Sequence, residues 1–293
     1  MKASKIEKIS SKMGGSTLTK VARTHCIKHL LDTLRANGRG ISDMAEIKAK
    51  DIQWYVGHQL QENITKRTLQ NRMSCIRTFL REIERKQLAN SKHLSCKTLG
   101  IDKASRNGTH QALSKAEYEQ AIEQAKQRHA GFAACLVLQR ELGLRAREVV
   151  QSVPSLQSWK HSLERGQVVR VIHGTKGGRP RDTGVVDQQK ALEAVLTAIN
   201  AVDKGTGRLI QSKSLQGAMR AFGRHCAAVK LTGKHSSHAL RCTYTHERYS
   251  QHLENLGDRR EALAATSQDL GHGDGRGTYV VQVYLANPAP SPQ

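Results

Sequence analysis

The sequence predicts a mainly α-helical protein with one small β-hairpin, which makes it an α+β chain of two domains. Apolar residues recur at helical spacing through most of its 293 residues. Only the stretch 167–186 shows the β-branched, alternating pattern of two strands around a glycine-rich turn. Residues 91–112 have no periodicity and contain Asn-Gly-Thr, which indicates a linker between the two domains.

The smaller domain is expected over residues 17–90, after a basic, Gly/Ser-punctuated stretch at 1–16 that we interpret as a flexible arm. Apolar spacing predicts helices over 18–34, 43–60 and 65–83. The third of these helices carries a basic face opposite its apolar one. That face is formed by Lys66, Arg67, Arg72, Arg77, Arg81 and Arg85. Both a solvated surface and a contact for an anionic partner fit this pattern.

The larger domain is expected over residues 113–286, and it begins with a capping box formed by Ser114 and Glu117. Its helices are predicted over 115–128, 131–142, 188–201, 212–229, 238–256 and 259–270, with a short one after Gly143. Strands at 167–173 and 182–186 flank a turn at 174–178, which places Lys176 near the tip of the hairpin. Residues 287–293 are rich in proline and are expected to form a disordered tail.

The formal net charge of +22 exceeds what solubility requires and makes nucleic acid the expected partner. Residues 1–110 carry 22 Lys and Arg against 9 Asp and Glu, and the remainder carries 25 against 16, so both domains are basic. The N-terminus lacks the apolar core of a secretory signal, and no run is apolar enough to span a membrane. The six cysteines form no Cys-x-x-Cys pair. We therefore expect a cytoplasmic protein with reduced thiols and no membrane contact.

Phosphate-binding side chains follow several apolar segments of the larger domain. They are Arg145, Lys176, His238, Arg241 and His272, followed by Tyr279 and Tyr284. Paired arginines can clamp phosphate oxygens and offset the charge that grows during phosphoryl transfer. A phenol can act as nucleophile, a histidine as its base and a lysine as the acid for a leaving oxygen. Few carboxylates accompany the imidazoles and no nucleotide-binding loop is present, so we expect neither metal nor cofactor.

The order and surroundings of these residues resemble the tyrosine recombinases, the phage-integrase family, and in particular integrases of mobile bacterial elements. The stretch GLRARE resembles the family's first arginine box, with Arg145 as the catalytic arginine and Glu148 as its acidic support. Lys176 resembles the family's hairpin lysine. The stretch HALR, with His238 and Arg241, resembles the second box, and LGH, with His272, resembles the third. The resemblance covers most of the chain, loosely in the smaller domain and through specific motifs in the larger one.

This resemblance implies a two-domain clamp on double-stranded DNA, with a core-binding domain at 17–90 and a catalytic domain at 113–286. It implies a site-specific recombinase that integrates or excises a mobile element through a 3′-phosphotyrosyl intermediate. It further implies a homotetramer on two DNA sites, with an accessory directionality factor as a possible partner, working at the bacterial nucleoid. In this reading Arg145 and Arg241 hold the phosphate, His238 and His272 assist, and Lys176 protonates the leaving oxygen.

The sequence departs from the family at the nucleophile. The usual spacing after His272 leads to Val281, whereas Tyr279 comes two residues early and Tyr284 three residues late. We favour Tyr284, because its neighbours resemble the usual surroundings of the nucleophile and the glycine-rich insert 273–277 can absorb a change in length. Tyr279 remains the alternative.

Two other functions stay open. A type IB topoisomerase-like enzyme would use the same residues but rejoin the same strand. A catalytically inactive DNA-binding regulator would keep the fold and lack a catalytic residue. Every box is filled here, which argues against the regulator, and the unusual spacing of the tyrosines is its only support.

Overall fold

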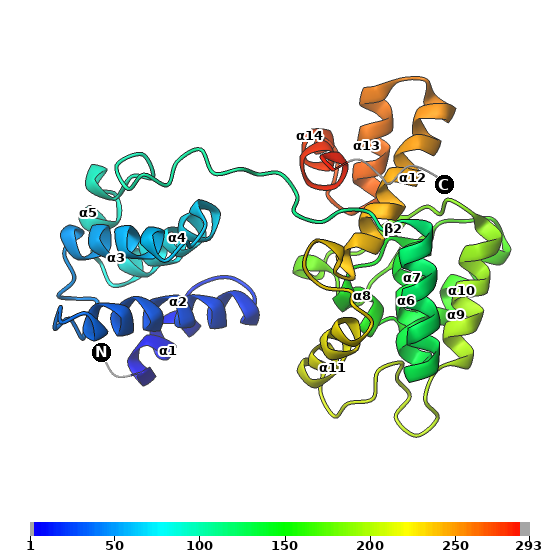
Figure 1. Ribbon diagram of the computed structural model, residues 1–293, viewed down its shortest axis with the longest axis horizontal. Coiled ribbons are helices and arrows are strands. Elements are labelled where there is room, and N and C mark those ends of the chain that lie inside the picture. The colour runs from blue at the N-terminus through cyan, green and yellow to red at the C-terminus, as the bar shows by residue number, and fades with distance from the viewer. Residues whose placement is uncertain (1–2, 288–293) are drawn as a thin grey trace. The chain divides into compact units, whose positions relative to one another are not determined.

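A computed structural model describes residues 3–287, which form two compact units (Figure 1). The first unit ends at Arg106 and the second begins at Asn107. The boundary therefore falls inside the linker expected at 91–112. Within residues 3–287, no helix is both long and apolar enough to cross a membrane.

The first unit is a helical bundle. Its elements are α1 (Ala3–Lys12), α2 (Thr17–Ala36), α3 (Ala49–Gln61), α4 (Lys66–Glu82), α5 (Lys86–Ala89) and the 3-10 turn η1 (Lys92–Leu94). The helices predicted at 18–34 and 65–83 are confirmed as α2 and α4. The helix predicted from residue 43 starts only at Ala49, because the Asp51 carboxylate accepts from the Lys48 backbone N–H at 2.9 Å and fixes the first turn there.

The prediction of a flexible arm at 1–16 is wrong for the described part of that stretch. Residues 3–12 form α1, and Ile6 and Met13 are buried in the core of the first unit. Lys5 forms an ion pair with Asp43 at 3.2 Å. Apolar residues at helical intervals are enough to dock this polar helix, although its composition resembles that of a free basic tail.

The prediction that residues 91–112 form a linker is wrong at both ends of that range, because residues from 107 onward already belong to the second unit, where Ala112 is buried. Leu94, Leu99 and Ile101 are buried in the first unit, and Gln70 Nε2 donates to the carbonyl of Ile101 at 2.7 Å. Only the chain after Ile101 runs without regular structure as far as Ser114. The connection between the units is therefore shorter than the sequence indicates.

The second unit is mainly helical. Its elements are α6 (Lys115–Arg128), α7 (Ala130–Leu142), α8 (Ala146–Val150), η2 (Val153–Ser155), α9 (Leu156–Glu164), β1 (Val169–Val171), η3 (Lys176–Gly178), β2 (Arg181–Thr183), α10 (Gln188–Asn200), α11 (Leu215–Ala228), η4 (Gly233–His235), α12 (His238–Leu256), α13 (Arg259–Asp269), α14 (Gly277–Val280) and the π-helical turn η5 (Val281–Leu285). The hairpin is confirmed: β1 pairs antiparallel with β2, with Val169 opposite Thr183. The capping box at Ser114 is also confirmed.

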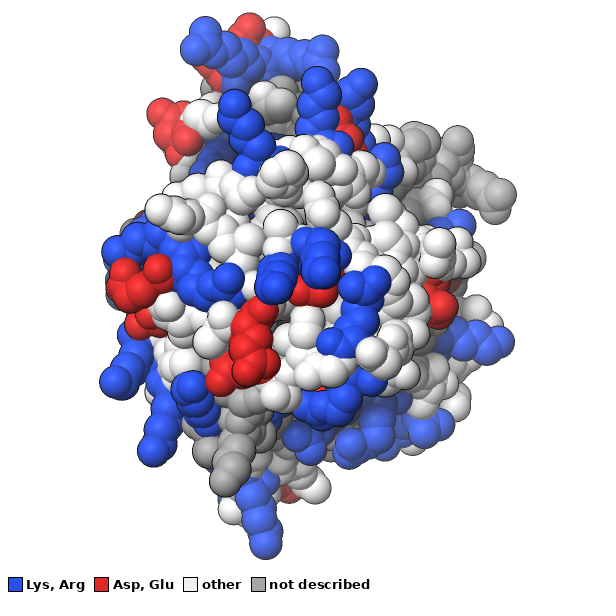
Figure 2. Space-filling model, turned by 90° about the vertical axis from the view of Figure 1, so that its left-hand side faces the viewer, with Lys and Arg blue, Asp and Glu red and all other residues white. Residues whose placement is uncertain are grey.

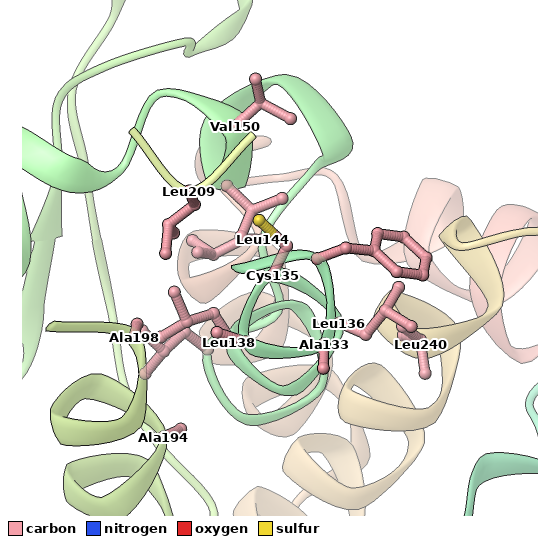
Figure 3. Close-up of a cluster of buried hydrophobic side chains, with 14 of the residues drawn as sticks. Ala133, Cys135, Leu136, Leu138, Leu144, Val150, Ala194, Ala198, Leu209 and Leu240 are labelled. Atoms are coloured by element: carbon pink, nitrogen blue, oxygen red, sulfur yellow. The ribbon is translucent and has the colours of Figure 1, made fainter. Parts of the chain in front are cut away.

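Helix α7 forms the centre of the main core of the second unit (Figure 3). Its side chains Leu136 and Leu138 are fully buried, and α10 contributes the small residues Ala194 and Ala198, which let the helices approach closely. Leu240 of α12 closes another side. This core holds α8 and α12, which carry much of the site described below.

A smaller apolar cluster lies beneath the end of the described chain. It contains Cys242, Tyr244, Leu270, Val280 and Tyr284.

The proline-rich tail predicted at 287–293 lies outside the described residues, apart from Asn287. On the face of the molecule in Figure 2, Lys and Arg side chains are more widespread than Asp and Glu. A surface of this kind suits a polyanionic partner.

Candidate active site

The site is organised around Glu148, a fully buried carboxylate on α8. Helix α7 ends at Gly143, whose backbone is left-handed (φ 57°) and lies so close to Tyr244 that a Cβ would approach its ring to 2.4 Å. Arg145 then caps α8. Glu148 accepts from the Arg145 backbone N–H at 2.8 Å and from its guanidinium at 2.5 Å. The N3 carboxylate of α8 thus bonds back to the backbone and side chain of its N-cap residue, and fixes the first predicted arginine beside its acidic partner.

Arg241 enters from α12 and is completely buried. Its Nε donates to the Tyr284 hydroxyl at 3.3 Å and its Nη2 to the Leu270 carbonyl at 2.6 Å, while Nη1 donates to the carbonyl of Gly143. Its guanidinium lies 4.0 Å from the Glu148 carboxylate. The second predicted arginine therefore joins the two boxes and the tyrosine in one network.

Arg181, at the start of β2, is a third guanidinium that the sequence analysis missed. It is buried and donates to Glu148 at 3.0 Å and to the Gly143 carbonyl at 3.2 Å. Burial and the charge of Arg241 lower the pKa of Arg181. The sequence around Arg181 contains no motif that indicates this role. The hairpin pattern shows only that successive side chains alternate between the two faces of the sheet.

These three guanidiniums share one carboxylate. Burial by itself raises the pKa of Glu148, but Arg181, Arg241 and Arg145 outweigh it and hold that pKa at about 2. The cluster of Arg145, Glu148, Arg181 and Arg241, here called the guanidinium cluster, therefore keeps a positive charge excess inside the protein. Such a site is suited to receive an anion.

Tyr284, on η5, places its hydroxyl between two of the predicted residues. It receives the Arg241 bond described above and lies 3.1 Å from Nε2 of His272. The ring of His238 lies 5.7 Å from the Tyr284 ring. Tyr284 is 3% exposed, whereas Tyr279 is 37% exposed and contacts the site through its ring, 4.7 Å from that of His272. Only the Tyr284 hydroxyl is hydrogen-bonded to both an arginine and a histidine of the site within the described chain.

Both histidines of the site are neutral at physiological pH. Burial and the charge of Arg241 lower the pKa of His238 to about 3. Burial, Arg241 and Arg145 lower the pKa of His272 to about 3. A neutral His272 can accept a proton from the phenol, which an imidazolium cannot do.

Lys176 lies apart from these contacts. It is exposed in η3, between the two strands, as the sequence analysis expected for the hairpin tip. Its charge adds to those that lower the pKa of His272, so it is within electrostatic reach of the site. The structure thus gathers Arg145, His238, Arg241, His272 and Tyr284, and leaves Lys176 on the hairpin above them.

The fold and the site define a class of protein. A phenol held between a buried guanidinium and a neutral imidazole, on a mainly helical fold with one hairpin, is the arrangement expected of tyrosine recombinases. The family model described as Integrase matches residues 100–247, just over half of the chain, and the model described as Phage integrase, N-terminal, matches residues 2–89. The chain belongs to the integrase family of tyrosine recombinases, enzymes that break and rejoin DNA.

Two solved structures share the fold of this chain at low sequence identity. A lambda integrase (75–356) dimer bound to a COC′ core site is 15% identical, with 99% of this chain and 97% of that chain covered and a TM-score of 0.63. The Tn1549 transposon integrase in complex with transposon right end DNA is 16% identical, with 96% and 94% covered and a TM-score of 0.58. A search of curated protein sequences gave no match. The Integrase match ends before His272 and Tyr284, so these two are related to the site by their geometry and by the sequence resemblance described above.

Proposed function

We propose that this chain is a site-specific DNA recombinase in which Tyr284 is the nucleophile. The observation that carries the proposal is the position of the Tyr284 hydroxyl, 3.3 Å from Arg241 Nε and 3.1 Å from His272 Nε2. A guanidinium can only donate, so Arg241 directs a hydrogen at the phenol oxygen. The phenol hydrogen is then free to point at neutral His272. Arg241 stabilises the phenolate that forms, and His272 takes its proton.

Arg145 is the guanidinium best placed to meet the DNA. Its side chain is 22% exposed, whereas that of Arg241 has no exposed surface. We infer that a phosphodiester oxygen first binds Arg145, with Glu148 holding that side chain in place. As the Tyr284 oxygen bonds to phosphorus it leaves Arg241, whose Nε can then donate to a phosphate oxygen. His238 supports the phosphate from the same side of α12 as Arg241.

The chemistry is a reversible exchange of esters. The Tyr284 oxygen–phosphorus bond forms, the bond from phosphorus to the 5′-oxygen breaks, and Lys176 gives the leaving oxygen its proton. The product is a 3′-phosphotyrosyl link with a free 5′-hydroxyl. The 5′-hydroxyl of a partner strand then reverses the step. The bond energy stays in the phosphotyrosyl link, so the reaction requires no nucleotide.

The proposed assembly is a homotetramer on two DNA sites, integrating or excising a mobile element in the cytoplasm, with an accessory directionality factor as a possible further partner. The basic charge of both units and the fold of the relatives support DNA as the substrate. A lambda integrase tetramer bound to a Holliday junction shares the fold, with 19% identity, 94% of this chain and 75% of that chain covered, and a TM-score of 0.57. Two sites and four strands need four nucleophiles.

The decisive experiment traps covalent protein–DNA adducts on a nicked recombination site. Tyr284→Phe should abolish the adduct, while Tyr279→Phe, the matched control on the adjoining helix α14, should retain it. The reverse result would transfer the nucleophile to Tyr279. Adducts formed by the double variant would refute tyrosine chemistry altogether.

A topoisomerase-like activity is the second candidate, because strand rejoining needs the same residues. It is tested with a supercoiled plasmid that lacks recombination sites. Efficient relaxation of this plasmid would favour the topoisomerase, and relaxation confined to plasmids with a site would favour the recombinase. An inactive DNA-binding regulator would form no adduct on any substrate.

A further inference from the structure

The chain that enters the second unit passes directly against the turn that carries Tyr284. The Gly108 backbone N–H donates to the Gln282 carbonyl at 2.7 Å. The Asn287 side-chain amide donates to the Gly108 carbonyl at 3.2 Å and to the His110 carbonyl at 2.8 Å. Residues 108–110, here called the strap, are therefore bonded on both sides of Tyr284.

Gly108 makes this contact through its lack of a side chain. A Cβ at this position would lie 1.9 Å from the Val283 carbonyl oxygen, which is an impossible approach. Gly108 is not among the glycines with a positive φ, so its backbone conformation is open to any residue. Glycine is thus required here because the strap lies so close to the turn, and not because of the backbone conformation of Gly108.

The strap also reaches the other side of the site. The His110 ring lies 4.8 Å from the His238 ring in an edge-on contact, and His110 Nδ1 lies 3.2 Å from the Ser236 hydroxyl. From α12, Arg241 Nε donates to the Tyr284 hydroxyl at 3.3 Å. Turn η5 is consequently held between α12 and the strap.

A turn of this kind needs such support. η5 directly continues α14, and the two together span only Gly277–Leu285, which is too short for a helix to be stable without tertiary contacts. A nucleophile displaced by about 1 Å loses on the order of 100-fold in rate. Contacts that fix η5 therefore act directly on the position of the Tyr284 hydroxyl.

We propose that the strap and Asn287 form a latch that positions the nucleophile within its own protomer. Gly108 and His110 are positioning residues, since they act on Tyr284 and His238 and do not touch the reacting atoms. This inference rests on the proposed function, because it takes Tyr284 as the nucleophile. It adds that the segment leading to the catalytic unit is part of the active site.

Two variants of the full chain test the latch. Gly108→Ala introduces the clash with Val283, and Asn287→Asp keeps the shape of the side chain but removes its donors and sets a negative charge against two carbonyls. Gly223→Ala is the matched control, because Gly223 lies in the same unit, has no positive φ and has open space around its Cβ position. The measurement is the single-turnover rate of adduct formation on a nicked site at saturating DNA, together with DNA affinity and thermal midpoint.

We expect both latch variants to form the adduct about 100-fold more slowly, with DNA affinity unchanged and Gly223→Ala like the unmodified protein. A merely structural role would lower the thermal midpoint and leave the rate of the folded fraction unchanged, which overturns the proposal. Rates equal to or above that of the unmodified protein also overturn it. If Gly108→Ala fails to fold, Asn287→Asp decides the question alone.

Mixing variants tests whether the latch acts within one protomer. Tyr284→Phe protomers with an intact strap are added to Gly108→Ala protomers with an intact tyrosine. Restored adduct formation would show that the strap acts on a neighbour and would overturn the proposal. A continued low rate supports the latch within one chain. The proposed function fails separately, if Tyr284→Phe alone still forms adducts.

Discussion

The arginines of α4 in the first unit and those of the guanidinium cluster in the second have different partners. In the first unit, side chains of α4 donate to neutral oxygens: Arg72 to the Tyr55 hydroxyl at 3.1 Å, and Arg81 to the Asn90 side chain at 3.0 Å. Arg77 and Arg85 likewise donate to backbone carbonyls. In the second unit, three guanidiniums converge on Glu148. The number of arginines in a segment is therefore a poor guide to function. The number of arginines that share one carboxylate is a better one.

The basic face predicted on α4 is therefore largely structural. Four of its six members donate within the unit, and Lys66 and Arg67 at its start are exposed. Periodicity showed that these side chains share a face, but it could not show that neighbouring loops offer carbonyls to them. Of the face that the sequence predicts, Lys66 and Arg67 are the residues best placed to contact DNA.

The largest expected effect comes from removing the shared carboxylate. Glu148→Gln leaves buried guanidiniums without their counter-charge and should destabilise the chain by about 3–5 kcal/mol. Asp182→Asn is the matched control, because its pair with Arg170 is exposed and contributes about 0–1 kcal/mol. Urea unfolding followed by circular dichroism measures both. Similar losses in the two variants would mean that the cluster is no different from a surface pair.

A second prediction separates an arginine that we propose to be catalytic, Arg145, from a structural one, Arg72. Arg145→Lys keeps the charge but loses the planar fork, so adduct formation should fall by about 100- to 1000-fold with little change in stability. Arg72→Lys should do the opposite, lowering stability by about 1–3 kcal/mol while the folded protein keeps its rate. Adduct kinetics and thermal unfolding distinguish the two. A lower rate of adduct formation in folded Arg72→Lys would contradict a purely structural role for Arg72.

A third prediction concerns acid. The pKa values of His238 and His272 in the folded state, about 3, lie below the unfolded value of 6.5, so the unfolded chain takes up protons first and stability falls as the pH drops from 6.5 towards 3. The pKa of Glu148 is about 2 in the folded chain and 4.5 in the unfolded chain. As the pH falls from 4.5 towards 2, the free energy of unfolding therefore decreases by a further roughly 3 kcal/mol.

This acid effect should be larger in the second unit than in the first, where burial and the charge of Arg72 lower the pKa of His29 as well. Each unit contains one tryptophan, Trp54 in the first and Trp159 in the second. A Trp54→Phe variant reports the second unit alone, and a Trp159→Phe variant reports the first. Fluorescence-detected urea midpoints should decline with acid more steeply for Trp159 than for Trp54. Parallel declines would count against a cluster-specific cause.

The smallest predicted effect is on salt dependence. DNA affinity should fall steeply with added salt, and Lys66→Ala or Arg67→Ala should each reduce the slope of log affinity against log salt by about 1. Fluorescence anisotropy over a salt series gives this slope. Arg72→Ala should leave it nearly unchanged, because that guanidinium donates inside the unit. An equal change of slope in all three variants would indicate that the whole basic face contacts DNA.

The fold was readable from the sequence wherever apolar spacing was strong. Helices α2, α4, α6 and α7 appear within a few residues of their predicted bounds. Helix α1 was missed because its few apolar residues stand among lysines and serines. Helix α9 was missed although Leu156, Trp159 and Leu163 have helical spacing and are buried, so this signal was available.

The site was predictable only where residues stand in a local motif. Arg145 and Glu148 are three residues apart in the stretch that resembles the first arginine box, and the structure pairs them at 2.5 Å. Arg181 joins Glu148 through the hairpin, and His110 meets His238 from the segment between the units. Such long-range contacts depend on how the elements pack, which periodicity does not encode. The 12 residues between His272 and Tyr284 are bridged by the glycine-rich insert, which the sequence shows, and by α14 and the π-turn η5, which it does not.

The charge excess of the guanidinium cluster has a thermodynamic consequence. A phosphodiester that binds there relieves repulsion which the free protein must hold in its interior, so DNA acts as a ligand of the folded state. At 100 times its dissociation constant, such a ligand adds about 2.7 kcal/mol to the free energy of unfolding. We expect the chain to resist proteolysis and heat best while it occupies its target, and its lifetime in the cell to depend on the presence of that DNA.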